Sequence, residues 1–232
     1  MTRVLNRGGP ARMAFFIDTI FAAPTIDAIR DALAQEGLFE DGAKTASGAA
    51  KAVKSNLQAR KGDAVVKRAS DMVRETLEQN SDFQAAALPA KFARITFSRY
   101  TAGMSYGTHV DNAFINGVRT DLSFTLFLSD PDSYRGGELI IKRHDGDEAV
   151  KLPSGALYLY PSDTLHSVAP VEEGERLAAV GWVQSRVRLE EHRAVLFDLD
   201  RTLRQLPKTE DAEPLRLNLL RVRNSLLRLW AD

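Results

Sequence analysis

Between residues 92 and 188 the chain is a series of short runs rich in β-branched and aromatic residues, and this pattern constrains the fold more than any other feature. Gly, Pro, Asp or Ser residues separate the runs, and no helical pattern lies between them. The runs are RITFSRY, LSFTLFL, GELIIKR, AVKLP, ALYLYP, LHSVAPV and LAAVGWVQSRV. Strands at such close spacing predict a sandwich or a double-sheet jelly roll rather than a parallel α/β sheet.

Helical patterns flank this β-rich region on both sides. Apolar residues recur at helical spacing between residues 15 and 88, and Pro89 then acts as a helix breaker. The helical period returns after residue 188 and continues to the C-terminus. We therefore expect an α+β chain in four parts. These are an N-terminal extension (1–12), a helical cover (13–88), a jelly-roll core (89–188) and a C-terminal helical segment (189–232).

Composition narrows the functions open to the chain. Its 232 residues include 31 Lys and Arg against 31 Asp and Glu, so no basic field favours nucleic acid. Because Cys is absent, disulfides and thiolate chemistry are excluded, and a metal must be held by His and carboxylates. No run approaches the roughly 18 apolar residues of a membrane span, and the polar start does not resemble a signal peptide. We therefore expect a cytoplasmic protein without a membrane partner.

Two of the four His residues indicate a metal site. His109 and Asp111 are two positions apart, so in an extended segment both side chains project from the same face. His166 follows the strand ALYLYP and begins another apolar run. Two imidazoles and one carboxylate on a sheet form the facial triad that holds non-haem Fe(II) and leaves positions open. A His-X-Asp sequence is also common in surface or hydrogen-bonded pairs, so the triad needs support from its context.

Arg176 supplies part of that context. It follows His166 by ten residues, across the turn-like segment PVEEGE, and a hairpin there would return it toward the metal. Its planar guanidinium can bind a carboxylate through two parallel hydrogen bonds, which suits a dicarboxylate ligand. The alternative is a surface ion pair with Glu172, Glu173 or Glu175.

The chain resembles the PKHD-type hydroxylases, a bacterial branch of the Fe(II)/2-oxoglutarate dioxygenases related to prolyl 4-hydroxylases. The resemblance extends from about residue 13 to the C-terminus, and its motifs occur in order. They are RYTAGMSYGTHVDNA, RTDLSFTLFLSDP, GGELIIK, VKLPSGALYLYPSDTLHSVAPV and ERLAAVGWVQSRVR. The resemblance implies a double-stranded β-helix core. It also implies an enzyme that couples oxidative decarboxylation of 2-oxoglutarate, with release of succinate and CO2, to hydroxylation by O2.

The resemblance also implies roles for single residues. His109, Asp111 and His166 would ligate Fe(II), and Arg176 would pair with the far carboxylate of 2-oxoglutarate. Tyr100 matches a tyrosine that hydrogen-bonds the co-substrate in prolyl hydroxylase relatives, with strand packing as an equal alternative. L-Ascorbate is implied as a reductant. Related halogenases have a small residue in place of Asp111, so hydroxylation is favoured here.

Substrate and assembly stay open at the level of sequence. A peptide and a small molecule are both compatible with the chain, and some relatives are linked to bacterial iron uptake. The segments 114–119 and 143–147 would select the substrate, and the second contains the His144 hairpin. Trp182 matches a family position but is expected to pack in the core. A homo-oligomer could form through the C-terminal helices, and a non-redox, cupin-like metal-binding module is the alternative function.

Overall fold

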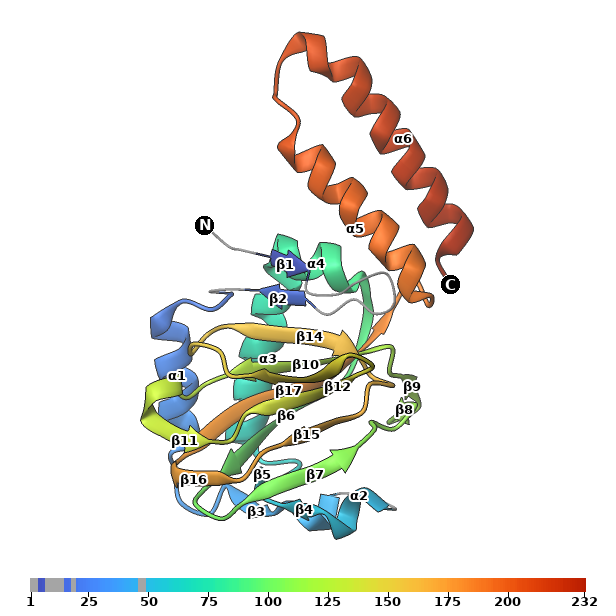
Figure 1. Cartoon of the computed structure of the whole chain (residues 1–232). Coiled ribbons are helices and arrows are strands. Elements are labelled where there is room, and N and C mark those ends of the chain that lie inside the picture. Colours follow the sequence, from blue (N-terminus) through green and yellow to red (C-terminus); the bar gives the residue numbers. More distant parts are fainter. Residues whose placement is uncertain (1–3, 7–14, 18–19, 46–48) are drawn as a thin grey trace.

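The computed structural model describes residues 4–6, 15–17, 20–45 and 49–232. Two facing β-sheets form the centre of the molecule, helices cover the outer face of the larger sheet, and a helical hairpin projects from one end (Figure 1). This arrangement confirms the predicted α+β class and the double-stranded β-helix core.

Within the described residues the larger sheet has eight strands, in the order β1-β2-β14-β10-β17-β6-β5-β3. All of its pairings are antiparallel. The bounds are β1 (Val4–Asn6), β2 (Phe15–Ile17), β3 (Phe39–Asp41), β5 (Leu57–Ala59), β6 (Pro89–Tyr100), β10 (Leu122–Phe127), β14 (Leu157–Pro161) and β17 (Arg176–Ser185).

The smaller sheet has the order β13-β12-β15-β7-β4 and is also antiparallel. Its strands are β4 (Lys54–Ser55), β7 (Ser105–His109), β12 (Leu139–Arg143), β13 (Gly146–Val150) and β15 (His166–Val168). Two further short pairs lie at the ends of the sandwich. They are β8 (Phe114–Ile115) with β9 (Val118–Arg119), and β11 (Tyr134–Gly136) with β16 (Val171–Gly174).

The helices lie before and after the β-rich region. Their bounds are α1 (Ala23–Leu33), α2 (Ala49–Ala52), α3 (Ala64–Gln79), α4 (Ser81–Ala87), α5 (Glu190–Gln205) and α6 (Glu213–Trp230), with 3-10 turns at Gly42–Thr45, Pro131–Ser133 and Glu210–Ala212. The Asp63 and Asn80 side chains cap α3 and α4 by accepting hydrogen bonds from backbone N–H groups in the first turn. The predicted cover over 13–88 is therefore not purely helical, because β2 to β5 also lie there. These strands have two or three residues each, too few to show an alternating pattern.

The outer face of the larger sheet forms the main core against α1 and α3. Phe97 of β6 and Phe124 of β10 pack there with Ile29 and Leu77, and none of the four has exposed surface. Because side chains alternate along a strand, the neighbours of Phe97 point to the opposite face, between the two sheets. The larger sheet thus separates a helix-covered apolar core from an inner face that can carry polar groups.

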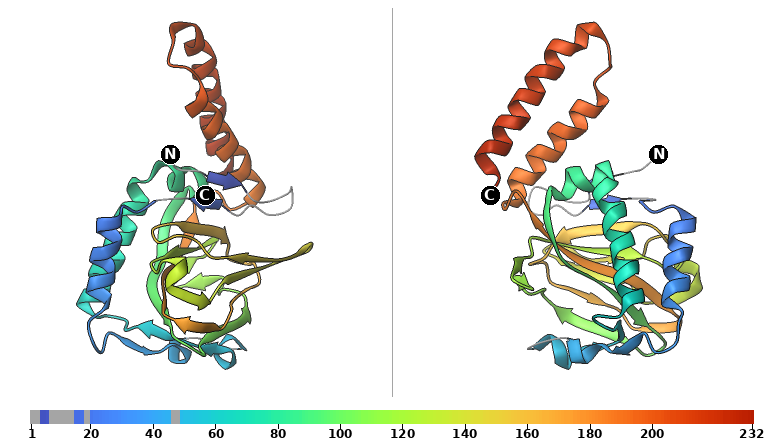
Figure 2. Two further views of the ribbon diagram at one scale, coloured as in Figure 1. Left: turned by 60° about the vertical axis from the view of Figure 1, so that its left-hand side comes forward. Right: turned by 180° about the vertical axis from the view of Figure 1, so that it is seen from behind.

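Helices α5 and α6 form a hairpin that points away from the sheets (Figure 2). At its base, Leu196 joins Leu88 and Val187 in a small core, and Leu226 and Trp230 pack against it. Farther along, no residue of α6 is fully buried. Its exposed side chains include Leu215, Leu217, Leu220, Val222 and Leu229.

The predicted extension over residues 1–12 lies largely outside the described residues. Within it, residues 4–6 form β1, which pairs with β2 at the edge of the larger sheet. The proposed boundaries near residues 88 and 188 stay predictions. Among the described residues, no helix has both the length and the apolar character needed to cross a membrane.

Candidate active site

His109, Asp111 and His166 converge between the two sheets. One ligand atom from each lies within 4.8 Å of the others, and the described residues contain no second such cluster. The Nε2 atoms of His109 and His166 each lie 3.9 Å from a different carboxylate oxygen of Asp111. β15 places His166 directly opposite His109 on β7, while Asp111 follows the end of β7. Asp111 is two residues after His109, and its carboxylate therefore lies beside the His109 imidazole just beyond the end of β7.

Backbone carbonyls fix both imidazole rings. The Nδ1 atom of His109 lies 2.9 Å from the carbonyl oxygen of Gly107, and that of His166 lies 2.9 Å from the carbonyl oxygen of Thr164. A carbonyl can only accept, so Nδ1 carries the proton and the Nε2 lone pair faces the cluster. Burial, followed by the neighbouring His166, lowers the pKa of His109 to about 4. His109 is thus neutral at neutral pH, as a metal ligand must be.

Neighbouring side chains hold the other parts of the cluster. The Ser123 hydroxyl donates to a carboxylate oxygen of Asp111 at 2.6 Å and lies 2.8 Å from the Ser162 hydroxyl. Tyr106 stacks on His109 with ring centres 3.7 Å apart, and Tyr160 meets the His166 ring edge-on at 5.1 Å. Sequence reasoning missed these supporting residues, although Ser123 and Tyr160 lie on strands that it predicted.

Arg176 is one of the largest fully buried side chains, with 2% of its surface exposed. β17 places it directly opposite Tyr100 on β6, and its central guanidinium carbon lies 5.2 Å from the Tyr100 ring centre. Within the described residues no carboxylate forms an ion pair with it, and its Nε atom has no hydrogen-bond partner. Burying an unpaired charge is costly, so this guanidinium is suited to an anionic ligand.

The alternative surface ion pair of Arg176 is not formed. Glu172 and Glu173 both pair with Arg135, and Glu175 pairs with Arg99. A Cβ atom at Gly137, whose φ is +67°, would lie 3.1 Å from the Arg176 side chain. The turn before β12 therefore needs glycine both for its backbone and for the room it leaves the arginine.

One cavity of about 330 Å³ joins all five predicted site residues. The three metal-ligand candidates line it together with Arg176 and Tyr100, and so does Trp182. Trp182, expected to pack in the core, is thus half-buried on the cavity wall. A space of this size suits a small ligand, and polar groups converge on it from both sheets.

Comparisons with known proteins show the family of this chain. A family model described as the 2OG-Fe(II) oxygenase superfamily matches residues 95–184. A PKHD-type hydroxylase of Parvibaculum lavamentivorans is 51% identical over 199 residues, which are 86% of this chain and 90% of that protein. The chain belongs to the PKHD-type hydroxylases. It is therefore an enzyme that uses Fe(II), 2-oxoglutarate and O2.

Other relatives extend the match in sequence and in fold. A PKHD-type hydroxylase of Maricaulis maris is 43% identical over 221 residues, covering 95% of this chain and all of that protein (100%). In structure, a Pseudomonas putida prolyl-4-hydroxylase aligns with a TM-score of 0.54 at 20% identity, covering 76% of this chain and 94% of that one. At this identity the structural likeness shows a shared jelly-roll fold.

Of the two segments expected to select the substrate, 114–119 contributes to the cavity and 143–147 does not. Segment 114–119 forms the β8–β9 hairpin, and Phe114, Ile115 and Asn116 line the cavity. Asn116 and Gly117 both have positive φ, so Asn-Gly forms the two-residue turn that this dipeptide favours. None of residues 143–147 lines the cavity. In the second hairpin Lys142 pairs with Asp147 and Arg143 pairs with Glu148.

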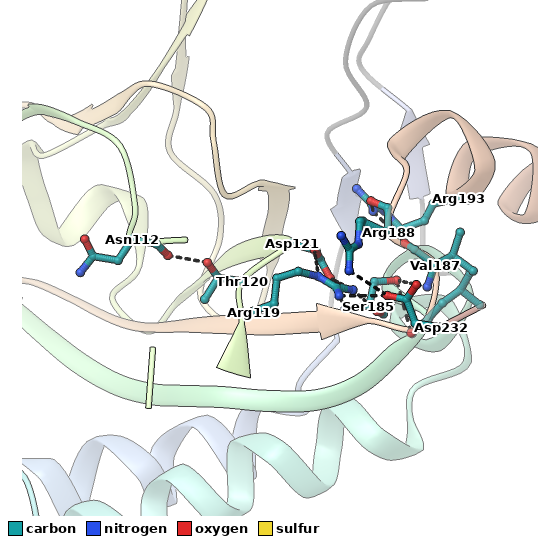
Figure 3. Close-up of polar contacts among 10 residues, drawn as sticks. Asn112, Arg119, Thr120, Asp121, Ser185, Val187, Arg188, Arg193 and Asp232 are labelled. Atoms are coloured by element: carbon teal, nitrogen blue, oxygen red, sulfur yellow. Dashed lines mark hydrogen bonds and ion pairs between the residues drawn. The ribbon is translucent and has the colours of Figure 1, made fainter. Parts of the chain in front are cut away.

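A polar network fixes the base of the β8–β9 hairpin (Figure 3). Thr120 donates through its hydroxyl to the Asn112 carbonyl, next to Asp111. Arg119 forms ion pairs with Asp121 at 2.7 Å and with Asp232 at 2.9 Å. The last residue of the sequence is thereby tied to a hairpin that borders the cavity.

Proposed function

We propose that His109, Asp111 and His166 bind Fe(II), that Arg176 binds the far carboxylate of 2-oxoglutarate, and that Tyr100 hydrogen-bonds the same co-substrate. The observation that carries this proposal is the convergence of three ligand atoms within 4.8 Å in the cavity that also contains the buried, unpaired Arg176. The membership in the 2OG-Fe(II) oxygenases supports it.

The donor set fits a ferrous ion. Two neutral imidazoles and one carboxylate leave the ion one positive charge and several open positions, which suits a chelating keto acid. When bound, Fe(II) supplies the site for oxygen activation and for oxidation of a C–H bond. Within the described residues, Arg176 is a cation at one side of the cavity that no carboxylate neutralises, so it fixes the length of diacid that the site accepts.

The chain's own residues prepare the cavity for this ligand. The carbonyls of Gly107 and Thr164 hold the imidazoles in one tautomer, and the Ser123 hydroxyl orients Asp111. Burial raises the pKa of Tyr100 above its usual value, so its hydroxyl keeps the proton that it would donate to a carboxylate. Each group is therefore positioned before ligand arrives.

We propose that the enzyme couples hydroxylation of its substrate to decarboxylation of 2-oxoglutarate. 2-Oxoglutarate, O2 and a substrate C–H give succinate, CO2 and a substrate C–OH, and L-ascorbate serves as a reductant that returns oxidised iron to Fe(II). The substrate is a peptide or a small molecule, and a link with bacterial iron uptake is part of the proposal. One structural neighbour is described as a prolyl hydroxylase from Trichoplax adhaerens in complex with a peptide fragment. A cytoplasmic location and the absence of nucleic-acid and membrane partners stay predictions from the sequence.

The decisive experiment separates oxygen chemistry from metal binding alone. Purified protein receives Fe(II) and 2-oxoglutarate without oxygen, and the visible charge-transfer band of the chelate is recorded before oxygen is admitted and succinate is assayed. We expect the band and then succinate. A protein that binds Zn(II) or Mn(II) but yields neither signal with Fe(II) would instead be the non-redox, cupin-like module. Asp111→Ala is the control, since it removes a ligand and both signals.

We also propose that α6 mediates a homo-oligomer. Leu215, Val222 and Leu229 are 51%, 41% and 76% exposed, and they recur every seven residues, as one of the two positions of a coiled-coil seam does. Leu226 and Trp230 instead pack inward at the hairpin base. Replacing all three seam residues with Glu should lower the mass in solution to that of a monomer. Leu217→Glu, an equally exposed residue off the seam, is the control, and a monomeric wild type contradicts the proposal.

A further inference from the structure

Two cations of the cavity take no part in the proposed chemistry. Lys54, on β4, and Arg94, on β6, both line the cavity with the metal-ligand candidates. Arg94 is half-buried, and within the described residues no carboxylate forms an ion pair with it. Burial is the cause that lowers the pKa of Arg94. The cavity therefore holds positive charge that neither Fe(II) nor 2-oxoglutarate explains.

Arg94 and Arg176 lie far apart on the inner face of the larger sheet. In the β6–β17 ladder Arg176 is opposite Tyr100, whereas Arg94 is opposite Trp182. Arg94 lies six positions before Tyr100 on one strand, so their backbone positions are about 20 Å apart at the usual rise per residue. This separation along the strand places the two arginines at different parts of the cavity, and we assign them to different ligands.

Arg94 is close to the metal-ligand candidates in another direction, across the strands. Ser123, which holds Asp111, is opposite Trp182, and Trp182 is opposite Arg94. Neighbouring strands are about 4.8 Å apart, so the backbone positions of Ser123 and Arg94 are about 10 Å apart. A group bound at Arg94 can therefore belong to a small molecule whose other end lies beside Asp111.

Lys54 lies near Arg94, and its side chain contacts Gln58 and Tyr106. Its ammonium donates to the Gln58 side-chain oxygen at 2.7 Å and lies 5.1 Å from the Tyr106 ring centre. Gln58 in turn donates to Thr96. Burial, and next the charge of Arg94, lower the pKa of Lys54 to about 8. The carboxylates of Asp111 and Asp41 offset part of the repulsion between the two cations, and an anion placed near both would relieve more of it.

Trp182 adds an apolar surface and one further donor. Its indole Nε1 is buried and has no hydrogen-bond partner among the described residues. Phe114, 65% exposed, and Ile115 bring apolar groups of the β8–β9 hairpin to the same cavity. The composition of this end of the cavity suits a ligand with an apolar body and an anionic group.

We propose that Arg94 and Lys54 bind an anionic group, a carboxylate or a phosphate, of the prime substrate, with the body of the substrate lying across Trp182. This proposal deepens the proposed function and rests on it for the assignment of Arg176 to 2-oxoglutarate. It makes the substrate a small organic acid or phosphate ester that presents a carbon beside the metal-ligand candidates while its anionic group lies at Arg94 and Lys54.

Binding can be measured without turnover. In a Trp230→Phe background, Trp182 is the single tryptophan, and its fluorescence reports on ligands beside Arg94. The protein is loaded with Fe(II) and 2-oxoglutarate without oxygen and titrated with cyclohexanecarboxylate, cyclohexyl phosphate and the neutral cyclohexanecarboxamide. We expect one or both anions to bind at least about ten-fold more tightly than the amide, because a charge-assisted pair forms only with an anion. The preferred anion distinguishes a carboxylate substrate from a phosphate ester.

Variants locate the anion. Arg94→Gln and Lys54→Gln should each weaken anion binding about ten-fold and leave amide binding unchanged, while Arg94→Lys retains part of the preference. Lys91→Gln removes one exposed charge from the same strand and is the matched control. The charge-transfer band should show unchanged 2-oxoglutarate affinity in Arg94→Gln.

Three results would overturn the proposal. They are equal binding of the anions and the amide by the wild type, anion binding that survives in both Gln variants, and loss of 2-oxoglutarate affinity in Arg94→Gln. The last result would assign Arg94 to the co-substrate. The titrations are repeated without Fe(II) and 2-oxoglutarate. If the wild type fails to bind 2-oxoglutarate but keeps Arg94-dependent anion binding, the proposed function fails and the anion site stands.

Discussion

The β-rich core and the C-terminal hairpin use apolar residues in opposite ways. Every residue of β10 and β14 is buried, because helices cover one face of the larger sheet and the smaller sheet covers the other. Helix α6 has no fully buried residue and exposes apolar side chains along its length. A core that closes on itself can hold catalytic groups in fixed positions, whereas an unpaired apolar helix is suited to assembly.

The two regions meet at one junction. Asp232, two residues after the end of α6, pairs with Arg119 beside the cavity, and the buried Arg193 of α5 donates to the carbonyls of Val187 and Arg188 (Figure 3). We therefore expect substitutions in the core to abolish the reaction, and substitutions at this junction to lower stability while leaving the reaction intact.

The largest expected effect is that of Asp111→Ala in the core. Removing one of three ligands should abolish Fe(II) binding at micromolar metal and lower succinate formation by at least about 10³-fold. Fe(II) affinity is measured by anaerobic titration, with Asp198→Ala on α5 as the control carboxylate. Coupled 2-oxoglutarate and oxygen consumption by Asp111→Ala would show that the ligand assignment is wrong.

Arg176→Ala should have the next largest effect. The guanidinium is fully buried, so loss of its pair with the co-substrate should raise the KM for 2-oxoglutarate about 10²-fold, with Fe(II) affinity retained. Stability without ligand should change little, because the substitution also removes an unpaired buried charge. Steady-state kinetics and an anaerobic metal titration test both statements. An unchanged KM would exclude Arg176 from the co-substrate site.

The sequence predicted the core better than the hairpin for physical reasons. His109 and Asp111 are two residues apart, and His166 follows a clear strand, so local geometry already favours their meeting. Arg94 and Lys54 gave no signal, because they reach the cavity only through the long-range pairing of β6 with β17 and of β4 with β7. Their placement depends on register, which alternation on single strands does not define.

The C-terminal hairpin, too, could be predicted only in part from the sequence. Its helical period was visible in the sequence, but periodicity does not tell which apolar face meets the protein and which meets solvent. Leu226 and Leu229 are three residues apart on α6, yet the first packs at the base and the second is 76% exposed. The two residues differ in burial because of the direction in which the hairpin leaves β17, and the sequence pattern does not define that direction.

Arg193→Gln should give a smaller effect, confined to stability. Its side chain is 4% exposed and donates to two backbone carbonyls, so its loss should lower the free energy of unfolding by about 1–3 kcal/mol. Denaturant unfolding measures the change, and the affinity for 2-oxoglutarate should stay as in the wild type. Arg201→Gln, which removes an exposed ion pair on the same helix, should change stability by less than about 0.5 kcal/mol. Equal losses in both variants would contradict a specific role for the junction.

The last expected effect concerns pH and returns to the core. Folding holds the pKa of His109 at about 4, below its usual 6.5, because burial and the adjacent His166 disfavour the imidazolium. Between these values the unfolded chain binds the proton and the folded chain does not, so acidification from pH 6.5 toward 4 should destabilise the metal-free protein by about 3 kcal/mol. His109→Gln should lose this part of the pH dependence in denaturant unfolding at a series of pH values. If the free energy of unfolding of the variant falls with pH as steeply as that of the wild type, the acid sensitivity arises outside the metal-ligand cluster. The cluster would then not be the source of the pH dependence.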